Sequence, residues 1–512
     1  MAFIYRYELR DPYNRISVDF RSNNHDIYIK QAIEKTFGDR LKNDPVFFNN
    51  FFEFRLKDTA KDKELRDMGK EIVSLDDYLD SIKKVNYKNK ELFQRIKNRF
   101  YGFLDLYSDC DNNLILDFNM VDCLDLSFVL NEEGFDSIQA NKSEFIKKLD
   151  TFNLCLEIDK RDFYSVYRAS KHDLNKEYYL VEHDWFLIEG SFTSKDKSNA
   201  VVYLDYAAEI IHEGEIEPNI PFRLKSIRTV DEGVKRNLSR YFNFDDLNYK
   251  IDPDLKGYSK DEKYHVAVYN VGQGLCTAVC DSQLKPVLYL DFGGGERRDS
   301  ITYPLGSISL DLSNKPPIVL SHWHRDHWVS IRYFKDAYNC MWIVPRQKLS
   351  PEAYKLGVEL SDAGNLYVAY SDQNVDPIGT IFVAKGRDTH WHNNGIGLLV
   401  QLVKTDEEGN DVVRRYLIPG DNRYEHIETC YFNDLDWLVA SHHGGVYFEG
   451  HHSCPNNIPR NEKDGRIVYS YGRHIKFSPY YNSHKHPSFV QDYINSGWNE
   501  ELSTPDGTHI LP

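Results

Sequence analysis

The sequence lacks the features that would place a protein in a membrane or outside the cytosol. No apolar run approaches the roughly 18 residues that a membrane-spanning helix needs. The opening residues are interrupted by charges and contain no apolar signal core. The 8 cysteines form no CxxC pair and no compact disulfide framework. These absences predict a soluble, cytoplasmic protein with reduced thiols and no membrane contact.

Net positive charge is also missing, because 79 acidic residues outnumber 63 basic ones and give a formal net charge of −16 at pH 7. A nucleic-acid substrate would therefore have to meet a local basic patch. Aromatic residues make up 14% of the chain, which argues against disorder. A chain of 512 residues is expected to hold two or three domains.

Histidine is scarce in residues 1–258, which hold only four of the 19 histidines: His25, His172, His183 and His212. The chemistry is therefore expected in residues 259–512. The first half mixes strand and helix patterns and predicts an α+β domain of no recognised family, which could bind a protein partner or the substrate.

Three stretches of the first half carry specific expectations. Residues 26–103 and 223–244 are predicted to be helical and rich in charge. Their basic faces are either simply solvated or form a surface for nucleic acid or a partner. Residues 245–261 are polar, contain Pro253 and Gly257, and predict a linker.

The densest chemistry follows an apolar run at residues 317–320, which predicts a buried strand. His322, His324, Asp326 and His327 come directly after it. Alternate residues of an extended segment face the same side, so His322 and His324 can aim at one point. Asp326 and His327 follow where the chain turns towards a helix and can aim at a second point. This set suits a pair of divalent metal ions.

The HxHxDH pattern resembles the metal signature of the metallo-β-lactamase fold. Further segments resemble, in order, the hydrolase domain of bacterial competence DNA-uptake channel proteins: residues 269–274 (YNVGQG), 392–394, 420–421, 442–445, 471–473 and 484–487. The similarity covers about residues 264–512, without the membrane channel of those proteins. It implies an α/β architecture, an αβ/βα sandwich, with metal-assisted hydrolysis as its activity.

The resemblance also divides the ligands between two metals. It implies His322 and His324 for the first metal, and Asp326 and His327 for the second. Asp421, which follows an apolar strand, would bridge both metals, or would instead only cap a turn.

Two ligand positions each keep two candidates. Either His390 or His392 would complete the first metal, and His392 is favoured because two asparagines follow it. Either His442 or His443 would complete the second, since adjacent residues on a turn rarely both reach one ion. The implied cofactors are two divalent ions, Zn²⁺ or Mn²⁺.

Later residues would face the substrate. In phosphoesterases of the fold that the sequence resembles, a late histidine protonates the leaving oxygen, and His484 and His486 are the candidates. Arg473 would stabilise phosphate charge or pair with a structural carboxylate. Arg325, inside the metal motif, suits an anionic substrate, and Trp328 would narrow the mouth of the site.

Together these features predict a phosphodiesterase, and more narrowly a nuclease acting on DNA or RNA, in which Asp326 is essential. Hydrolysis of a small ester, thioester or lactam is the alternative, and such enzymes have less need of the late histidines. A non-catalytic partner-binding protein is a third possibility, against which the complete ligand set argues. The combination of a hydrolase with an unfamiliar half also fits a bacterial defence effector.

Overall fold

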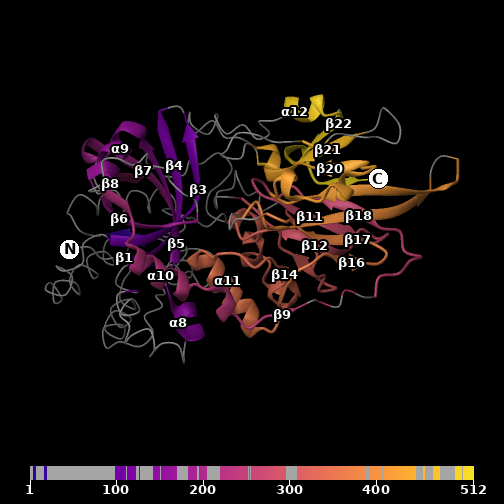
Figure 1. Ribbon diagram of the computed structural model, residues 1–512, viewed down its shortest axis with the longest axis horizontal. Coiled ribbons are helices and arrows are strands. Elements are labelled where there is room, and N and C mark those ends of the chain that lie inside the picture. Colours follow the sequence, from indigo (N-terminus) through magenta and orange to yellow (C-terminus); the bar gives the residue numbers. More distant parts are fainter. Residues whose placement is uncertain are drawn as a thin grey trace, which may run out of the picture. The chain divides into compact units, whose positions relative to one another are not determined.

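The computed structural model of the chain describes residues 4–6, 17–19, 99–110, 112–122, 126, 142–149, 151–169, 183–192, 195–204, 220–251, 253, 255, 257–295, 308–386, 391–405, 408–445, 454–455, 465–472, 490–498 and 500–511. The chain divides into two compact units, Met1–Arg240 and Tyr241–Pro512 (Figure 1).

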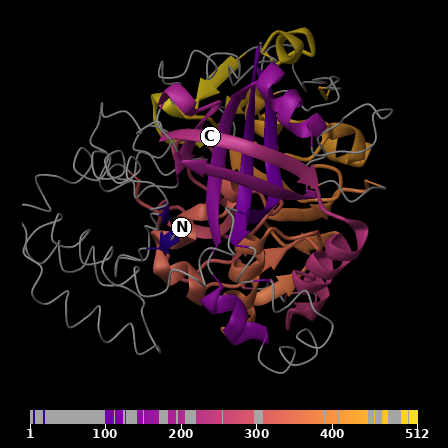
Figure 2. The same ribbon diagram turned by 90° about the vertical axis from the view of Figure 1, so that its left-hand side faces the viewer.

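The first unit contains a closed antiparallel barrel with the strand order β3-β4-β5-β7-β8-β6 (Figure 2). Its elements are β3 (Arg99–Cys110), β4 (Asn113–Asp122), α8 (Lys142–Lys148), β5 (Thr151–Asp159), α9 (Lys160–Ala169), β6 (Trp185–Phe192), β7 (Ala200–Leu204) and β8 (Ile220–Thr229). Alternate residues of β4, from Leu114 to Met120, lie in the barrel core, as the two-residue period of a strand requires. Phe163 and Tyr167, one turn apart on α9, complete that core. A separate pair of short strands, β1 (Ile4–Arg6) and β2 (Ser17–Asp19), also belongs to this unit.

The predicted helix at residues 223–244 is wrong for its first part. Residues up to Thr229 belong to β8, and the helix α10 is restricted to Glu232–Tyr241. The reason is visible in the alternation of buried Phe222 and Leu224 with exposed basic residues, which is a strand pattern. Residues 26–98 of the other predicted helical stretch lie outside the described residues.

Two mixed sheets make up the second unit. The first has the strand order β23-β10-β11-β12-β13-β14-β15-β9 and the second the order β16-β17-β18-β19-β20-β21-β22. The strands of the first sheet are β9 (Lys250–Ile251), β10 (His265–Val268), β11 (Cys276–Cys280), β12 (Pro286–Phe292), β13 (Ile318–Val319), β14 (Trp342–Val344), β15 (Leu366–Val368) and β23 (His509–Leu511). Those of the second are β16 (Gln373–Val375), β17 (Gly379–Val383), β18 (Ile396–Thr405), β19 (Asp411–Ile418), β20 (Trp437–Val439), β21 (Arg466–Tyr469) and β22 (Glu500–Ser503).

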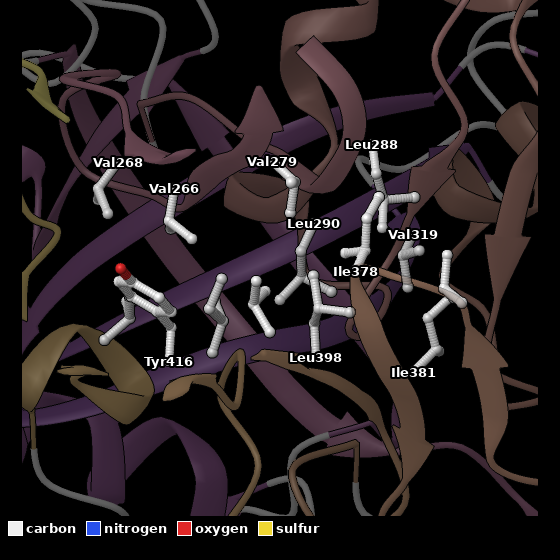
Figure 3. Close-up of a cluster of buried hydrophobic side chains, with 14 of the residues drawn as sticks. Val266, Val268, Val279, Leu288, Leu290, Val319, Ile378, Ile381, Leu398 and Tyr416 are labelled. Carbon is white, nitrogen blue, oxygen red and sulfur yellow. The ribbon is translucent and has the colours of Figure 1, made fainter. Parts of the chain in front are cut away.

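The two sheets pack face to face through one buried apolar cluster (Figure 3). Val279 and Leu290 from the first sheet meet Leu398 and Tyr416 from the second, and all four are buried. Burying such a side chain contributes about 1.5–3 kcal/mol, so this interface contributes strongly to the stability of the unit.

Helices cover the sheets on their outer sides. The helix α11 (Pro351–Asp362) lies against β15 of the first sheet. The helix α12 (Val490–Asn495) places Tyr493 in a second apolar cluster with Leu438 and Tyr469 of the other sheet. This order of layers agrees with the predicted αβ/βα sandwich.

The predicted linker at residues 245–261 is wrong in its first part. A short 3₁₀ helix occupies Phe244–Asp246, and β9 pairs in parallel with β15, with Lys250 opposite Tyr367 and Ile251 opposite Val368. The compact units divide after Arg240, ahead of the predicted boundary at 258.

Parallel strands bring the loops of the second unit to one edge of each sheet. β12 to β15 run parallel to each other, and so do β19 to β22. Loops that follow such strands gather at their carboxyl ends, where α/β proteins place their ligands. No helix within the described residues is long and apolar enough to cross a membrane.

Candidate metal centre

The loop after β13 supplies the first side chains of the centre. His322 and His324 face the same side, and His322 Nε2 lies 2.8 Å from His324 Nδ1. Asp326 and His327 follow in a 3₁₀ helix, Arg325–His327, and belong to a second group of donor atoms.

A first group of donor atoms forms where His392 and Asp421 join His322 and His324. Their ligand atoms all lie within 4.8 Å of one another, and all four residues are buried. His392 Nε2 lies 3.2 Å from His324 Nδ1. His390, the alternative candidate, lies outside the described residues.

A second group combines Asp326 and His327 with His443 from the loop after β20. His443 Nε2 lies 3.0 Å from Asp326 Oδ2, and His327 Nε2 lies 3.7 Å from Asp326 Oδ1. His442, the other candidate for this position, belongs to neither group.

Asp421 lies between the two groups. Its Oδ2 is 3.7 Å from His322 Nε2 and 3.9 Å from His392 Nε2, both in the first group. The same oxygen is 3.3 Å from His327 Nε2 and 3.9 Å from His443 Nε2, both in the second. One carboxylate oxygen is therefore close to imidazole nitrogens of both groups.

Asp291, which the sequence analysis missed, accepts hydrogen bonds from the loop that follows β13. Its Oδ1 accepts a bond of 2.6 Å from the Ser321 amide. Its Oδ2 accepts bonds of 2.8 Å from Ser321 Oγ and from His327 Nδ1. Because His327 donates through Nδ1, its Nε2 faces the centre. An acid that ends a buried strand next to the glycines at 293–295 was the signal that could have identified it.

His443 is oriented in the same way. Its Nδ1 donates to the Ser470 carbonyl at 2.7 Å, which leaves Nε2 to face Asp326 and Asp421. Ser470 in turn donates through Oγ to the Gly274 carbonyl at 2.7 Å, so the loops after β21 and before β11 support this ligand.

We expect Asp291→Asn to weaken metal binding without unfolding the protein. Loss of a carboxylate that orients a histidine ligand typically reduces metal affinity about 10- to 100-fold. Titration with a competing chelator measures the affinity, and the exposed Asp336→Asn in the same unit is the matched control. Equal affinities in wild type and Asp291→Asn would show that Asp291 does not orient His327.

The charges of the centre are strongly coupled. Burial alone would raise the pKa of Asp326, but His327 and His443 lower it to about 2. Burial opposes the charge of His327 too, yet Asp421, Asp326 and Asp291 hold its pKa well above the ordinary value. The pKa of His443 is raised as well, against burial, mainly by Asp421 and Asp326.

These shifts predict that metal binding releases protons. A metal ion binds only the neutral imidazole, whereas His327 and His443 stay protonated above the usual pKa of about 6.5 when no metal is present. Loading should release protons, and metal affinity should fall as pH is lowered. Calorimetry in buffers of different ionisation enthalpy counts the protons. A binding heat that does not depend on the buffer would contradict the prediction.

Glycines let other loops approach the metal motif closely. A Cβ at Gly293 would lie 1.8 Å from the Asp326 carbonyl oxygen, and one at Gly274 would lie 2.5 Å from it. That carbonyl accepts the amides of Gly294 at 3.1 Å and Leu275 at 3.3 Å. Gly274, Gly293 and Gly294 therefore allow their loops to pack closely against the backbone of Asp326.

Arg325 and Trp328 do not have the predicted positions. Arg325 Nε lies 3.6 Å from the buried carboxylate of Glu352 on α11, and Arg332 contacts the same carboxylate. Trp328 is 1% exposed and donates through Nε1 to the Trp323 carbonyl at 3.0 Å, so it belongs to the core and does not line a mouth. Arg325 was expected to serve an anionic substrate, but it instead forms an ion pair with Glu352 within the protein.

Three of the predicted catalytic residues, Arg473, His484 and His486, lie outside the described residues. Their roles stay predictions. The donor atoms that the structure does bring together fit divalent metal binding, because imidazole nitrogen with carboxylate oxygen suits zinc and related ions.

Comparison with solved structures finds similarity to the crystal structure of a long form RNase Z from yeast, with a TM-score of 0.29 and 11% sequence identity. The match covers 68% of this chain and 55% of the yeast chain, so this chain spans little more than half of that protein. No protein-family model and no curated protein matches the sequence. The facing sheets, outer helices and His/Asp centre are themselves consistent with a metallo-β-lactamase-like fold.

Proposed function

We propose that the second unit is a metal-dependent phosphodiesterase that holds two divalent ions and acts on DNA or RNA. The observation that carries this proposal is the position of Asp421 Oδ2, within 3.3–3.9 Å of imidazole nitrogens from both donor groups. A shared carboxylate is the arrangement that holds two ions close enough to act on one reacting centre.

The two sides of the centre offer different ligands. His322, His324 and His392 present three imidazole nitrogens on one side, and burial, together with His327 and His324, keeps the pKa of His322 well below its usual value. On the other side Asp326 and Asp421 supply negative charge. When bound there, divalent ions lower the pKa of water to about 7 and offset charge on phosphoryl oxygens.

The choice of a phosphodiester is supported by the order of motifs across residues 264–512, which resembles that of the competence-protein hydrolase domain. Because Arg325 pairs with Glu352, it no longer argues for an anionic substrate. The choice of a phosphodiester therefore depends on the order of the motifs. Several finer points stay predictions. They are the choice between zinc and manganese, a cytoplasmic location, a role in bacterial defence and a partner-binding role for residues 1–258.

Hydrolysis assays test the proposal. Purified protein is incubated with labelled single-stranded DNA, duplex DNA and RNA, each with Mn²⁺ or Zn²⁺, and in parallel with an aryl ester, a thioester and a lactam. We expect metal-dependent cleavage of at least one nucleic acid, absent from an Asp421→Ala preparation purified identically. Turnover of the ester, thioester or lactam without any phosphodiester would favour the alternative enzyme class.

A further inference from the structure

His442 lies beside the first donor group although it belongs to neither. Its ring centroid is 5.0 Å from that of His392 and 6.3 Å from that of its neighbour His443. The two adjacent histidines therefore have different neighbours: His443 lies next to Asp326, and His442 lies next to His392.

Exposure separates His442 from the ligand histidines. His322, His324, His392 and His443 are at most 7% exposed. His442 is half-buried, so among the described histidines of the centre it is the one that solvent reaches. His442 is therefore the ring of the centre that a substrate from solvent can reach most readily.

The backbone of the loop is held in an unfavourable conformation. His442 has φ 50° and ψ 43°, and His443 follows with φ 56° and ψ 16°. Two consecutive left-handed residues that are not glycine are rare, because the Cβ crowds the following carbonyl. The amide of Gly445 donates to the His442 carbonyl at 2.7 Å and closes the turn. Such conformations persist mainly where a side chain must be aimed for function.

We propose that His442 is a substrate-contacting catalytic residue, which donates an N–H to a non-bridging oxygen of the phosphoryl group beside the first donor group. The inference rests on the proposed phosphodiesterase function and deepens it. An imidazole offers an N–H donor in either protonation state, so the contact needs no particular charge on His442. Donors aimed at oxygens that gain charge in the transition state lower the barrier.

Two variants test this role with the full-length protein. His442→Gly removes the side chain and suits the left-handed backbone, and His442→Asn keeps a short polar group that also tolerates it. His265→Asn, at the far end of β10 opposite Cys280, is the matched control. Metal content, melting temperature, binding of inorganic phosphate, and kcat and KM on an aryl phosphodiester are measured for each protein.

Both His442 variants should keep the metal content of wild type, and His442→Gly should melt at the same or a higher temperature. Inorganic phosphate should bind about tenfold more weakly, the size of one hydrogen bond to a charged group. The value of kcat should fall roughly 10²-fold, as for loss of one transition-state donor. The control should match wild type in every measurement.

Loss of a metal from either variant would make His442 a ligand and overturn the inference. Unchanged phosphate binding and turnover would overturn it too, as would a melting temperature that falls in step with activity. A wild-type protein that binds phosphate through His442 yet cleaves no phosphodiester would refute the proposed function and the catalytic role of His442, and would leave only its contact with phosphate. A wild-type protein that neither binds phosphate nor cleaves a phosphodiester would refute both.

Discussion

Asp421→Ala should abolish metal binding at both donor groups and, with it, hydrolysis. Asp421 Oδ2 lies within 3.9 Å of nitrogens of His322, His392, His327 and His443. In the proposed two-metal centre its loss removes the shared ligand, and it also removes the main charge that raises the pKa of His327 and His443. The effect is therefore expected to be larger than for any ligand that serves one group.

Elemental analysis and rate measurements check this prediction. Metal content should fall from about two equivalents per chain to fewer than about half an equivalent. The rate should fall about 10³-fold or more, which corresponds to about 4 kcal/mol. Asp336→Asn, an exposed change in the same unit, should leave both unchanged. An Asp421→Ala protein that still binds one ion tightly would show that the groups are independent.

Gly293→Ala should destabilise the second unit and displace the metal loop. The added Cβ would lie 1.8 Å from the Asp326 carbonyl oxygen and 2.4 Å from that of Leu275. Both neighbours are backbone atoms, so neither can move aside as cheaply as the end of a flexible side chain could. We expect a loss of about 3 kcal/mol or more, at the upper end for overpacking.

The melting temperature of the second unit should fall by about 6–12 °C, and metal content should fall with it. Gly233→Ala is the control, because a Cβ there meets nothing within 4 Å. It should be neutral or slightly stabilising, since alanine favours a helix more than glycine does. If Gly293→Ala melts like wild type, the close approach to Asp326 is not what this glycine provides.

The positions of His322, His324, Asp326 and His327 could be predicted from the sequence, because a strand followed by a tight turn fixes their directions locally. The distinction between His442 and His443 could not. It depends on two left-handed backbone conformations, which residue type alone does not predict.

Contacts between residues that are distant in the sequence explain the predictions that were wrong and the residue that was missed. Arg325 looked free to bind an anion because its partner Glu352 is on a different element, α11. Asp291 was missed because its donors, Ser321 and His327, come from the next strand and loop. In the first unit, the basic residues of β8 hid the two-residue alternation of Phe222 and Leu224.

Anomalous diffraction from crystals loaded with Zn²⁺ or Mn²⁺ tests the central claim most directly. Two peaks are predicted, one among His322, His324 and His392 and the other among Asp326, His327 and His443, each within about 2.0–2.3 Å of its ligand atoms. Asp421 should contact both. A single peak, or two peaks of which neither touches Asp421, would contradict a bridged two-metal centre.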